Sequence, residues 1–182
     1  MSYSIEQDVN EILISKETLE KRVAELGEQI TRDYEGEPLM LVGILKGANI
    51  FMADLARAIK GRIQLEFMVV SSYGRGTESS GQVQILKDIS SSIEGMNILL
   101  VEDIIDTGLT LKYLKEYLGV RQAKSVRICT LLDKPERRVA DVDVDYVGFE
   151  VPNEFIIGYG IDYAEHYRNL PYIGSLKREI YE

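Results

Sequence analysis

The sequence predicts an α/β protein with a parallel twisted sheet flanked by helices. Runs rich in apolar residues at 39–45, 97–101 and 125–133 are typical of strands that are buried on both faces. Apolar residues at helical spacing follow the first two runs, at 49–59 and from Leu111 onward. Strands that alternate with helices build a parallel sheet, and such sheets bind ligands at the carboxyl ends of their strands.

Length and composition predict one compact domain over residues 1–182, with 45% apolar and 28% charged residues. Thirty acidic residues against 21 basic residues give a formal net charge of −9, which argues against a nucleic-acid-binding surface. Cys129 is the single cysteine and is expected to be a reduced thiol in the core. No apolar run approaches the roughly twenty residues of a membrane span, so we expect a cytoplasmic protein without membrane contact.

The N-terminal region is expected to hold a short apolar piece and then a helix. Ile12 to Ile14 form the apolar piece, and Ser15 is a favourable N-cap residue for the helix. The helix should end near Tyr34 and Gly36. Its apolar face is predicted from residues that recur three or four positions apart, at Leu19, Val23, Leu26 and Ile30.

Lys46 and Gly47 directly follow the predicted strand 39–45 and precede the predicted helix 49–59. A lysine at the end of a strand, with a glycine at a helix start, suits a phosphate or a pyrophosphate. The pair is a weak signal on its own, because a surface lysine beside a turn glycine is common.

Residues 71–82 are predicted to form a flexible loop between the strand 63–70 and its partner 82–88. The loop has three glycines and five serines or threonines, and little that can pack. Polar segments of this length between strands are uncommon unless they are lids or disordered. We favour a mobile lid, and a flexible hairpin without a role is the alternative.

The end of the strand 97–101 carries the densest cluster of polar residues. Glu102, Asp103 and Asp106 follow it, and Thr107, Gly108 and Thr110 lead into the next helix. The hydroxyls and the N–H groups at the helix start would surround a phosphate, but three carboxylates beside an anion repel it unless the ligand also offers hydroxyls or a metal. A sugar phosphate offers both, with Glu102 and Asp103 accepting from ribose hydroxyls, and this leaves Asp106 for chemistry.

The C-terminal half adds a third strand that ends in a cation. The strand 125–133 is followed by Lys134, and Glu136, Arg137 and Arg138 are expected to be solvated. Further strands are predicted at 142–151 and 155–161. The only histidine, His166, has no partner for a zinc motif and is expected to be structural or exposed. The tail 170–182 should pack on the body, with no assigned chemistry.

These motifs resemble those of the type I phosphoribosyltransferases. VEDIIDTGLTL at 101–111 resembles their 5-phosphoribosyl 1-pyrophosphate signature, and its form EDIIDTG looks like the hypoxanthine-guanine branch. LKGA at 45–48 resembles the pyrophosphate loop, and PNEFIIGYGIDY at 152–163 resembles the base-binding segment. The resemblance implies the type I phosphoribosyltransferase fold, in which a small hood built from the terminal segments covers the sheet.

The resemblance also implies roles for individual residues at the phosphate end of the site. Lys46, Gly47 and Arg168 would bind pyrophosphate, and Thr107, Gly108, Leu109 and Thr110 would bind the 5′-phosphate. Some relatives carry a lysine where this sequence has Leu109, so binding here should depend on amides and hydroxyls. Ser72 and Tyr73 would belong to a flap that closes over the reacting centre and excludes water. Asp162 would contact Mg2+, with Glu102 and Asp103 as further metal-site residues.

For the base, the resemblance implies a 6-oxopurine. Lys134 would bind the oxygen at position 6, Phe155 would stack on the ring, and the backbone near Ile156 would meet its edge. Asp106 would lie near N7 and act as general acid/base.

The implied activity is purine salvage, in which 5-phosphoribosyl 1-pyrophosphate and hypoxanthine or guanine yield IMP or GMP and pyrophosphate. A homodimer or homotetramer is implied by the family alone. Transfer to adenine or a pyrimidine is the nearer alternative, and a nucleic-acid-binding sensor that keeps the fold is the more distant one. Preference between hypoxanthine and guanine, and activity on xanthine, stay open.

Overall fold

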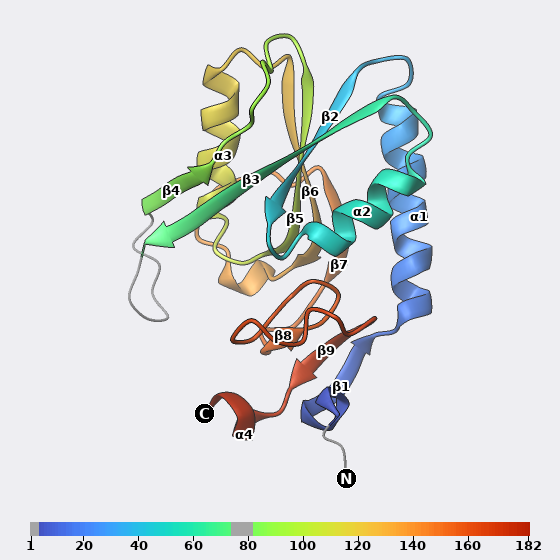
Figure 1. Ribbon diagram of the computed structural model, residues 1–182, viewed down its shortest axis with the longest axis vertical. Coiled ribbons are helices and arrows are strands. Elements are labelled where there is room, and N and C mark those ends of the chain that lie inside the picture. The colour runs from blue at the N-terminus through green and yellow to red at the C-terminus, as the bar shows by residue number, and fades with distance from the viewer. Residues whose placement is uncertain (1–3, 74–81) are drawn as a thin grey trace.

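The structure is a computed structural model that describes residues 4–73 and 82–182. Its main sheet has six strands in the order β4-β3-β2-β5-β6-β7, and only β4 is antiparallel to its neighbour. The predicted parallel sheet is therefore confirmed (Figure 1). Its strands are β2 (Leu39–Leu45), β3 (Ile63–Tyr73), β4 (Gln82–Lys87), β5 (Asn97–Ile105), β6 (Ser125–Asp133) and β7 (Tyr146–Glu150).

Helices cover both faces of this sheet, which explains why the central strands are apolar throughout. On one face lie α1 (Lys16–Asp33) and α2 (Asn49–Ala58), and on the other lies α3 (Leu109–Val120) (Figure 1). Alternate residues of one strand enter opposite cores: Leu99 packs in the cluster with α1 and α2, whereas Leu100 packs with α3. Cys129 is fully buried as predicted, and burial raises the pKa of its thiol.

The predicted helix start at Ser15 is confirmed, because its hydroxyl accepts a hydrogen bond from the backbone N–H of Thr18 at 3.2 Å. Along the described segments 4–73 and 82–182, no helix has the length and apolar character needed to cross a membrane.

A second, three-stranded sheet forms a hood over the carboxyl ends of the main strands. Its order is β1-β9-β8, so an N-terminal strand and two strands from the C-terminal third lie together (Figure 1). The expected hood is thus built from segments at both ends of the chain. Its elements are the 3-10 helix η1 (Ile5–Asp8), β1 (Val9–Ile14), β8 (Ile156–Ile157), β9 (Ile173–Leu176) and the short helix α4 (Arg178–Tyr181).

Two strand predictions were wrong in extent. The strand predicted at 142–151 begins only at Tyr146, and Val142 and Val144 pack beside α3 without pairing as a strand. Burial of alternate valines therefore mimicked a strand period. The strand predicted at 155–161 has only the two residues of β8, and it joins the hood. It stops because Gly158, Tyr159 and Gly160 all have positive φ (100°, 49° and 103°).

The flexible loop predicted at 71–82 lies largely outside the described residues. Strand β3 continues through Ser72 to Tyr73, and β4 begins at Gln82. The backbone of Ser72 and Tyr73 belongs to β3, but their side chains, and with them their predicted flap roles, lie outside what the structure describes.

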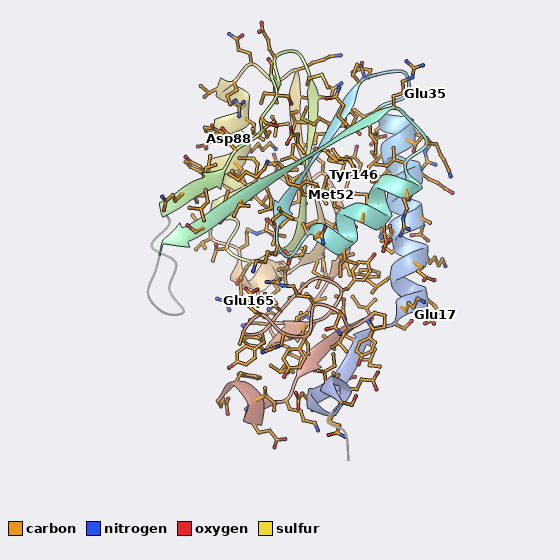
Figure 2. The ribbon with its side chains drawn as sticks, viewed as in Figure 1. Glu17, Glu35, Met52, Asp88, Tyr146 and Glu165 are labelled. Atoms are coloured by element: carbon orange, nitrogen blue, oxygen red, sulfur yellow. The ribbon has the colours of Figure 1, made fainter. Side chains whose placement is uncertain are left out.

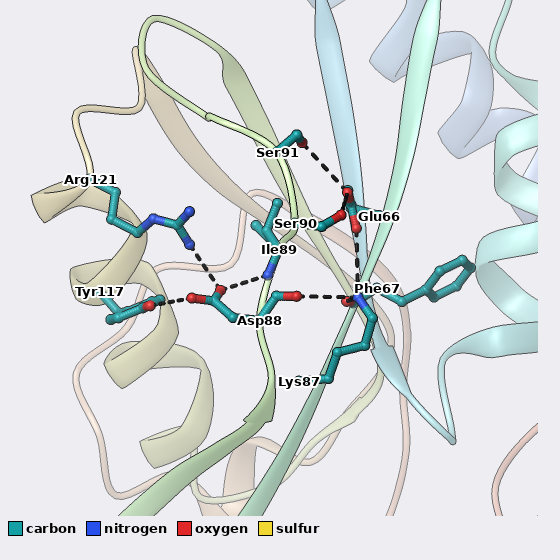
Figure 3. A network of polar contacts seen from close by, with 9 residues as sticks. All are labelled: Glu66, Phe67, Lys87, Asp88, Ile89, Ser90, Ser91, Tyr117 and Arg121. Atoms are coloured by element: carbon teal, nitrogen blue, oxygen red, sulfur yellow. Dashed lines mark hydrogen bonds and ion pairs between the residues drawn. The ribbon is translucent and has the colours of Figure 1, made fainter.

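Asp88 fastens the end of β4 to α3. Its carboxylate accepts hydrogen bonds from the Tyr117 hydroxyl, from Arg121 Nη1 at 2.9 Å and from the Ile89 N–H at 2.7 Å (Figure 3). Beside it, Lys87 Nζ donates to the Phe67 carbonyl of β3 at 2.7 Å. The pair of strands β3 and β4 at the edge of the sheet is therefore fixed to α3, the helix that follows the polar loop after β5.

Replacing Asp88 by Ala is expected to lower the free energy of unfolding by about 1–2 kcal/mol, because three donors lose a half-exposed acceptor. Asp88→Asn should recover part of this loss, since the amide oxygen still accepts. Urea unfolding followed by circular dichroism measures both variants. Equal stability of Asp88→Ala and the parent would show that the contacts add nothing.

Candidate active site

Three loops that carry predicted site residues meet at the carboxyl edge of the main sheet. Strands β2, β5 and β6 are parallel neighbours, and Lys46, Asp106 and Lys134 each follow the end of one of them. The register pairs Ile105 with Asp133, so the loops after β5 and β6 leave the sheet at the same level. This position is the ligand-binding edge of an open α/β sheet.

The Lys46–Gly47 loop touches the acidic end of β5. A Cβ at Gly47 would lie 1.8 Å from Asp103 Oδ2, and the loop carbonyl of Gly47 lies close to Gly160 of the hood. Only a glycine allows this approach without moving the carboxylate. The peptide bond between Leu45 and Lys46 is cis.

Glu102 and Asp103 form a partly buried pair of carboxyl groups at the end of β5. Burial, followed by the neighbouring charge of Asp103, raises the pKa of Glu102 well above its usual range. Burial also raises the pKa of Asp103, although its Oδ1 accepts the Ile104 N–H at 2.8 Å. The pair is therefore suited to ligand hydroxyls or a cation that stabilise its charge.

The loop after β5 turns at Gly108, whose φ is +80°, and α3 begins at the next residue. The first turn of that helix offers N–H groups, and the predicted phosphate-loop residues Thr107, Leu109 and Thr110 are all partly exposed beside them. The loop is attached to the segment after β6, because the Thr107 carbonyl accepts hydrogen bonds from the N–H groups of Val139 (3.0 Å) and Ala140 (2.9 Å).

Asp106 is held between two arginines that were expected to be solvated. Arg137 Nε lies 2.7 Å from its buried Oδ1, and Arg138 Nε donates to its carbonyl at 3.2 Å. The expectation was wrong for Arg138, which also pairs with Asp133 and is mostly buried. Arg138 braces the backbone beneath the Asp106 loop, whereas Arg137 balances the carboxylate charge.

Lys134 is 9% exposed, and its Nζ donates to the Glu154 carbonyl at 2.7 Å. Burial lowers the pKa of its ammonium, and the nearby charge of Asp106 opposes this effect. An ammonium has three protons, and within segments 4–73 and 82–182 this one makes a single hydrogen bond, so it can donate to a ligand oxygen as well.

Asp162 and Arg168 lie in the hood and pair with each other at 2.9 Å. Arg168 also donates to the Gly160 carbonyl at 2.7 Å, while Lys46 pairs with Glu165 at 2.7 Å across the boundary between sheet and hood. Figure 2 shows Glu165 at this boundary. Lys46 and Arg168, the two basic residues predicted to bind pyrophosphate, therefore both pair with carboxylates of the short hood segment 162–165.

A cavity of about 720 Å³ lies between the edge of the main sheet and the hood. Five predicted site residues line it, namely Asp106, Lys134, Phe155, Ile156 and Asp162. Lys46, Glu102, Asp103 and Arg168 are not among its lining residues: Glu102 and Asp103 lie at the end of β5, and Lys46 and Arg168 lie in adjoining loops. Of the residues that line the cavity, all but Asp162 were predicted to bind or act on the base, and Asp162 was predicted to contact Mg2+. The four residues outside the lining were predicted to bind the sugar and pyrophosphate.

Comparison with known proteins agrees with this geometry. A family model described as "Phosphoribosyl transferase domain" matches residues 9–164. The chain belongs to the phosphoribosyltransferase family. Its match to the family model includes both the loops of the main sheet and most of the hood segment that carries Phe155 and Asp162.

Individual relatives extend the family match over almost the whole chain. The hypoxanthine-guanine phosphoribosyltransferase of Streptococcus mutans is 55% identical over 177 residues, which are 97% of this chain and 98% of the relative. The bifunctional protein TilS/HprT of Listeria monocytogenes is 53% identical over 178 residues, 98% of this chain but only 28% of that protein. A crystal structure of a Staphylococcus aureus hypoxanthine phosphoribosyltransferase has a TM-score of 0.96 and 52% identity, covering 100% and 99% of the two chains.

Several residues around the cavity of this phosphoribosyltransferase were missed from the sequence. Arg137 could have been suspected, because it follows Lys134 at the same sheet edge. Glu165 and Tyr181 had no local signal, since their partners Lys46 and Phe155 are remote in sequence. Their roles depend on how the hood folds back onto the sheet.

Proposed function

We propose that the protein transfers the 5-phosphoribosyl group from 5-phosphoribosyl 1-pyrophosphate to N9 of hypoxanthine or guanine, giving IMP or GMP and pyrophosphate in purine salvage. The observation that carries this proposal is the shared cavity of Asp106, Lys134 and Phe155 beside the phosphate loop. The Streptococcus mutans relative is named a hypoxanthine-guanine phosphoribosyltransferase and the Staphylococcus aureus structure a hypoxanthine phosphoribosyltransferase, which supports the proposal.

The base is held by the part of the cavity that joins β6 to the hood. Lys134 donates to the oxygen at position 6, which disfavours a 6-amino group because that group offers no acceptor there. Phe155 is 37% exposed and lines the cavity, so its ring is available for stacking on the purine. The backbone at Ile156 meets the edge of the base.

The sugar and its phosphates are held by the end of β5 and by the loops that adjoin the cavity. Glu102 and Asp103 accept from the ribose hydroxyls, and Thr107, Gly108, Leu109 and Thr110 surround the 5′-phosphate with amides and hydroxyls. Lys46, Gly47 and Arg168 bind the pyrophosphate, for which Glu165 and Asp162 must release their cations.

The acidic residues fit Mg2+ that is bound mainly through substrate. Among residues 4–73 and 82–182, no group of three His, Cys, Asp or Glu side chains forms a protein-only metal site. Mg2+ commonly uses one or two carboxylates together with substrate oxygens, and Asp162 or the Glu102–Asp103 pair would supply them. When bound, the ion neutralises charge on the pyrophosphate.

In the reaction, the lone pair of purine N9 forms a bond to the anomeric carbon while the bond from that carbon to the pyrophosphate oxygen breaks. Bond breaking runs ahead, so positive charge develops on the sugar. The purine reacts with its proton on N7, and Asp106, near N7, accepts that proton as N9 is ribosylated, while Lys46 stabilises the negative charge on the leaving group.

A base panel tests this function. The protein is mixed with magnesium and 5-phosphoribosyl 1-pyrophosphate, and pyrophosphate release is followed after adding hypoxanthine, guanine, xanthine, adenine or uracil. We expect release with hypoxanthine or guanine and little with adenine or uracil. Release only with adenine or uracil would reassign the substrate, and release with no base would favour a sensor.

Replacing Gly47 by Ala is expected to raise the KM for 5-phosphoribosyl 1-pyrophosphate at least tenfold, because the new Cβ would lie 1.8 Å from Asp103 Oδ2 and displace that carboxylate. The melting temperature should change little, since only a side-chain end must move. Gly61→Ala is the matched control, as a Cβ there meets nothing within 4 Å. An unchanged KM in Gly47→Ala would show that the contact does not position Asp103.

We further propose a cytoplasmic enzyme that assembles as a homodimer or homotetramer. Light scattering after size exclusion measures the assembly directly.

A further inference from the structure

The last residues of the chain reach the ring that is proposed to hold the base. Tyr181 stacks on Phe155 with ring centroids 4.7 Å apart and an interplanar angle of 23°. Tyr163 contacts the same ring at 5.2 Å and 89°. Aromatic pairs at these distances add to the stability of an arrangement beyond the area that they bury.

Tyr181 is held in this position by the backbone of the hood. The Leu176 N–H donates to the Phe155 carbonyl at 2.8 Å, so the strand before α4 is tied to the residue that Tyr181 covers. Lys177 then bonds to the N-terminal segment, with its N–H 2.9 Å from the Asp8 carbonyl and its Nζ 2.6 Å from the Gln7 carbonyl. The start of α4 is therefore fixed from both sides.

The stacked pair belongs to the wall of the cavity. Tyr181, Phe155 and Lys134 all line it, and Lys134 donates to the carbonyl of Glu154, the residue before Phe155. Phe155 keeps 37% of its surface exposed despite its two aromatic neighbours. Its ring is thus clamped in orientation while part of it still faces the space available to a ligand.

We propose that Tyr181 is a positioning residue for the planar heteroaromatic base: it fixes the orientation of the Phe155 ring on which the base stacks. This inference rests on the proposed function and adds the C-terminal helix to the base site. A mobile phenylalanine would lose rotamer freedom on binding, whereas a clamped one has already lost it, so the clamp favours base binding. The hydroxyl of Tyr181 has no part in this role.

Steady-state kinetics of Tyr181→Ala test the proposal. The KM for hypoxanthine should rise roughly threefold to tenfold, the size expected for one lost aromatic pair. The KM for 5-phosphoribosyl 1-pyrophosphate should stay within about twofold, because that substrate binds at other loops. Tyr181→Phe should behave like the parent. Tyr113→Ala is the matched control, since it removes a half-exposed tyrosine that stacks on Tyr117 in α3.

A double-mutant cycle with Phe155→Ala separates positioning from other roles. If Tyr181 acts through Phe155, then Tyr181→Ala should have no further effect on the hypoxanthine KM once Phe155 is Ala. Additive effects would overturn the proposal, as would an unchanged hypoxanthine KM in the single variant. A lower KM would also overturn it, because it would make Tyr181 a competitor for the base. Absence of activity in the parent protein would instead refute the proposed function.

Discussion

Replacing Asp106 by Asn is expected to lower kcat by roughly a hundredfold to ten-thousandfold, the range for a lost general acid/base. Asn keeps the size of the side chain but cannot accept a proton, so the KM for 5-phosphoribosyl 1-pyrophosphate should change much less. Asp106 already lies in the cavity with a buried Oδ1 that Arg137 faces at 2.7 Å. Initial rates at saturating concentrations of both substrates measure the effect.

Asp143→Asn is the matched control for this variant, since it removes an exposed carboxylate from the irregular segment before β7. It should retain parental kcat. An Asp106→Asn enzyme with unaltered turnover would remove Asp106 from the mechanism and leave its carboxylate a loop brace. A large rise in KM with unchanged kcat would instead make it a binding residue.

Replacing Lys134 by Met is expected to lower kcat/KM for hypoxanthine by roughly tenfold to 150-fold, the cost of one hydrogen bond from a charged donor. Met preserves the apolar stem in a site where the lysine is 9% exposed, so the fold should persist. The KM for 5-phosphoribosyl 1-pyrophosphate should change little. Because the variant no longer donates a hydrogen bond to the oxygen at position 6, its preference for hypoxanthine over adenine should also decrease.

Lys21→Met, which removes an exposed lysine from α1, serves as the control. Steady-state kinetics of the parent and both variants give the ratio of kcat/KM for hypoxanthine to kcat/KM for adenine, which tests the role of Lys134. If Lys134→Met kept the parental ratio, then discrimination at position 6 would reside elsewhere, and the bond from Lys134 to the Glu154 carbonyl would be its main role.

The sequence by itself determined the main sheet and its ligand-binding edge. Strand β6 has the predicted bounds Ser125–Asp133, and β2 has the predicted bounds Leu39–Leu45. These strands could be predicted because both of their faces are buried over most of their length, which makes most of their residues apolar, and because parallel strands place their carboxyl ends at one edge. This is why three predicted site residues directly follow neighbouring strands at that edge, namely Lys46, Asp106 and Lys134.

Only the tertiary structure decided how the strands of the hood pair and which contacts the hood makes. Strand β8 has two residues, too few for a period, and it pairs with β9 and not with the main sheet. The pairs Lys46–Glu165 and Phe155–Tyr181 join segments that no local pattern connects. Residue periodicity indicates which face of a helix or strand is buried. It does not indicate which distant residue a side chain contacts, because that depends on how remote segments pack together.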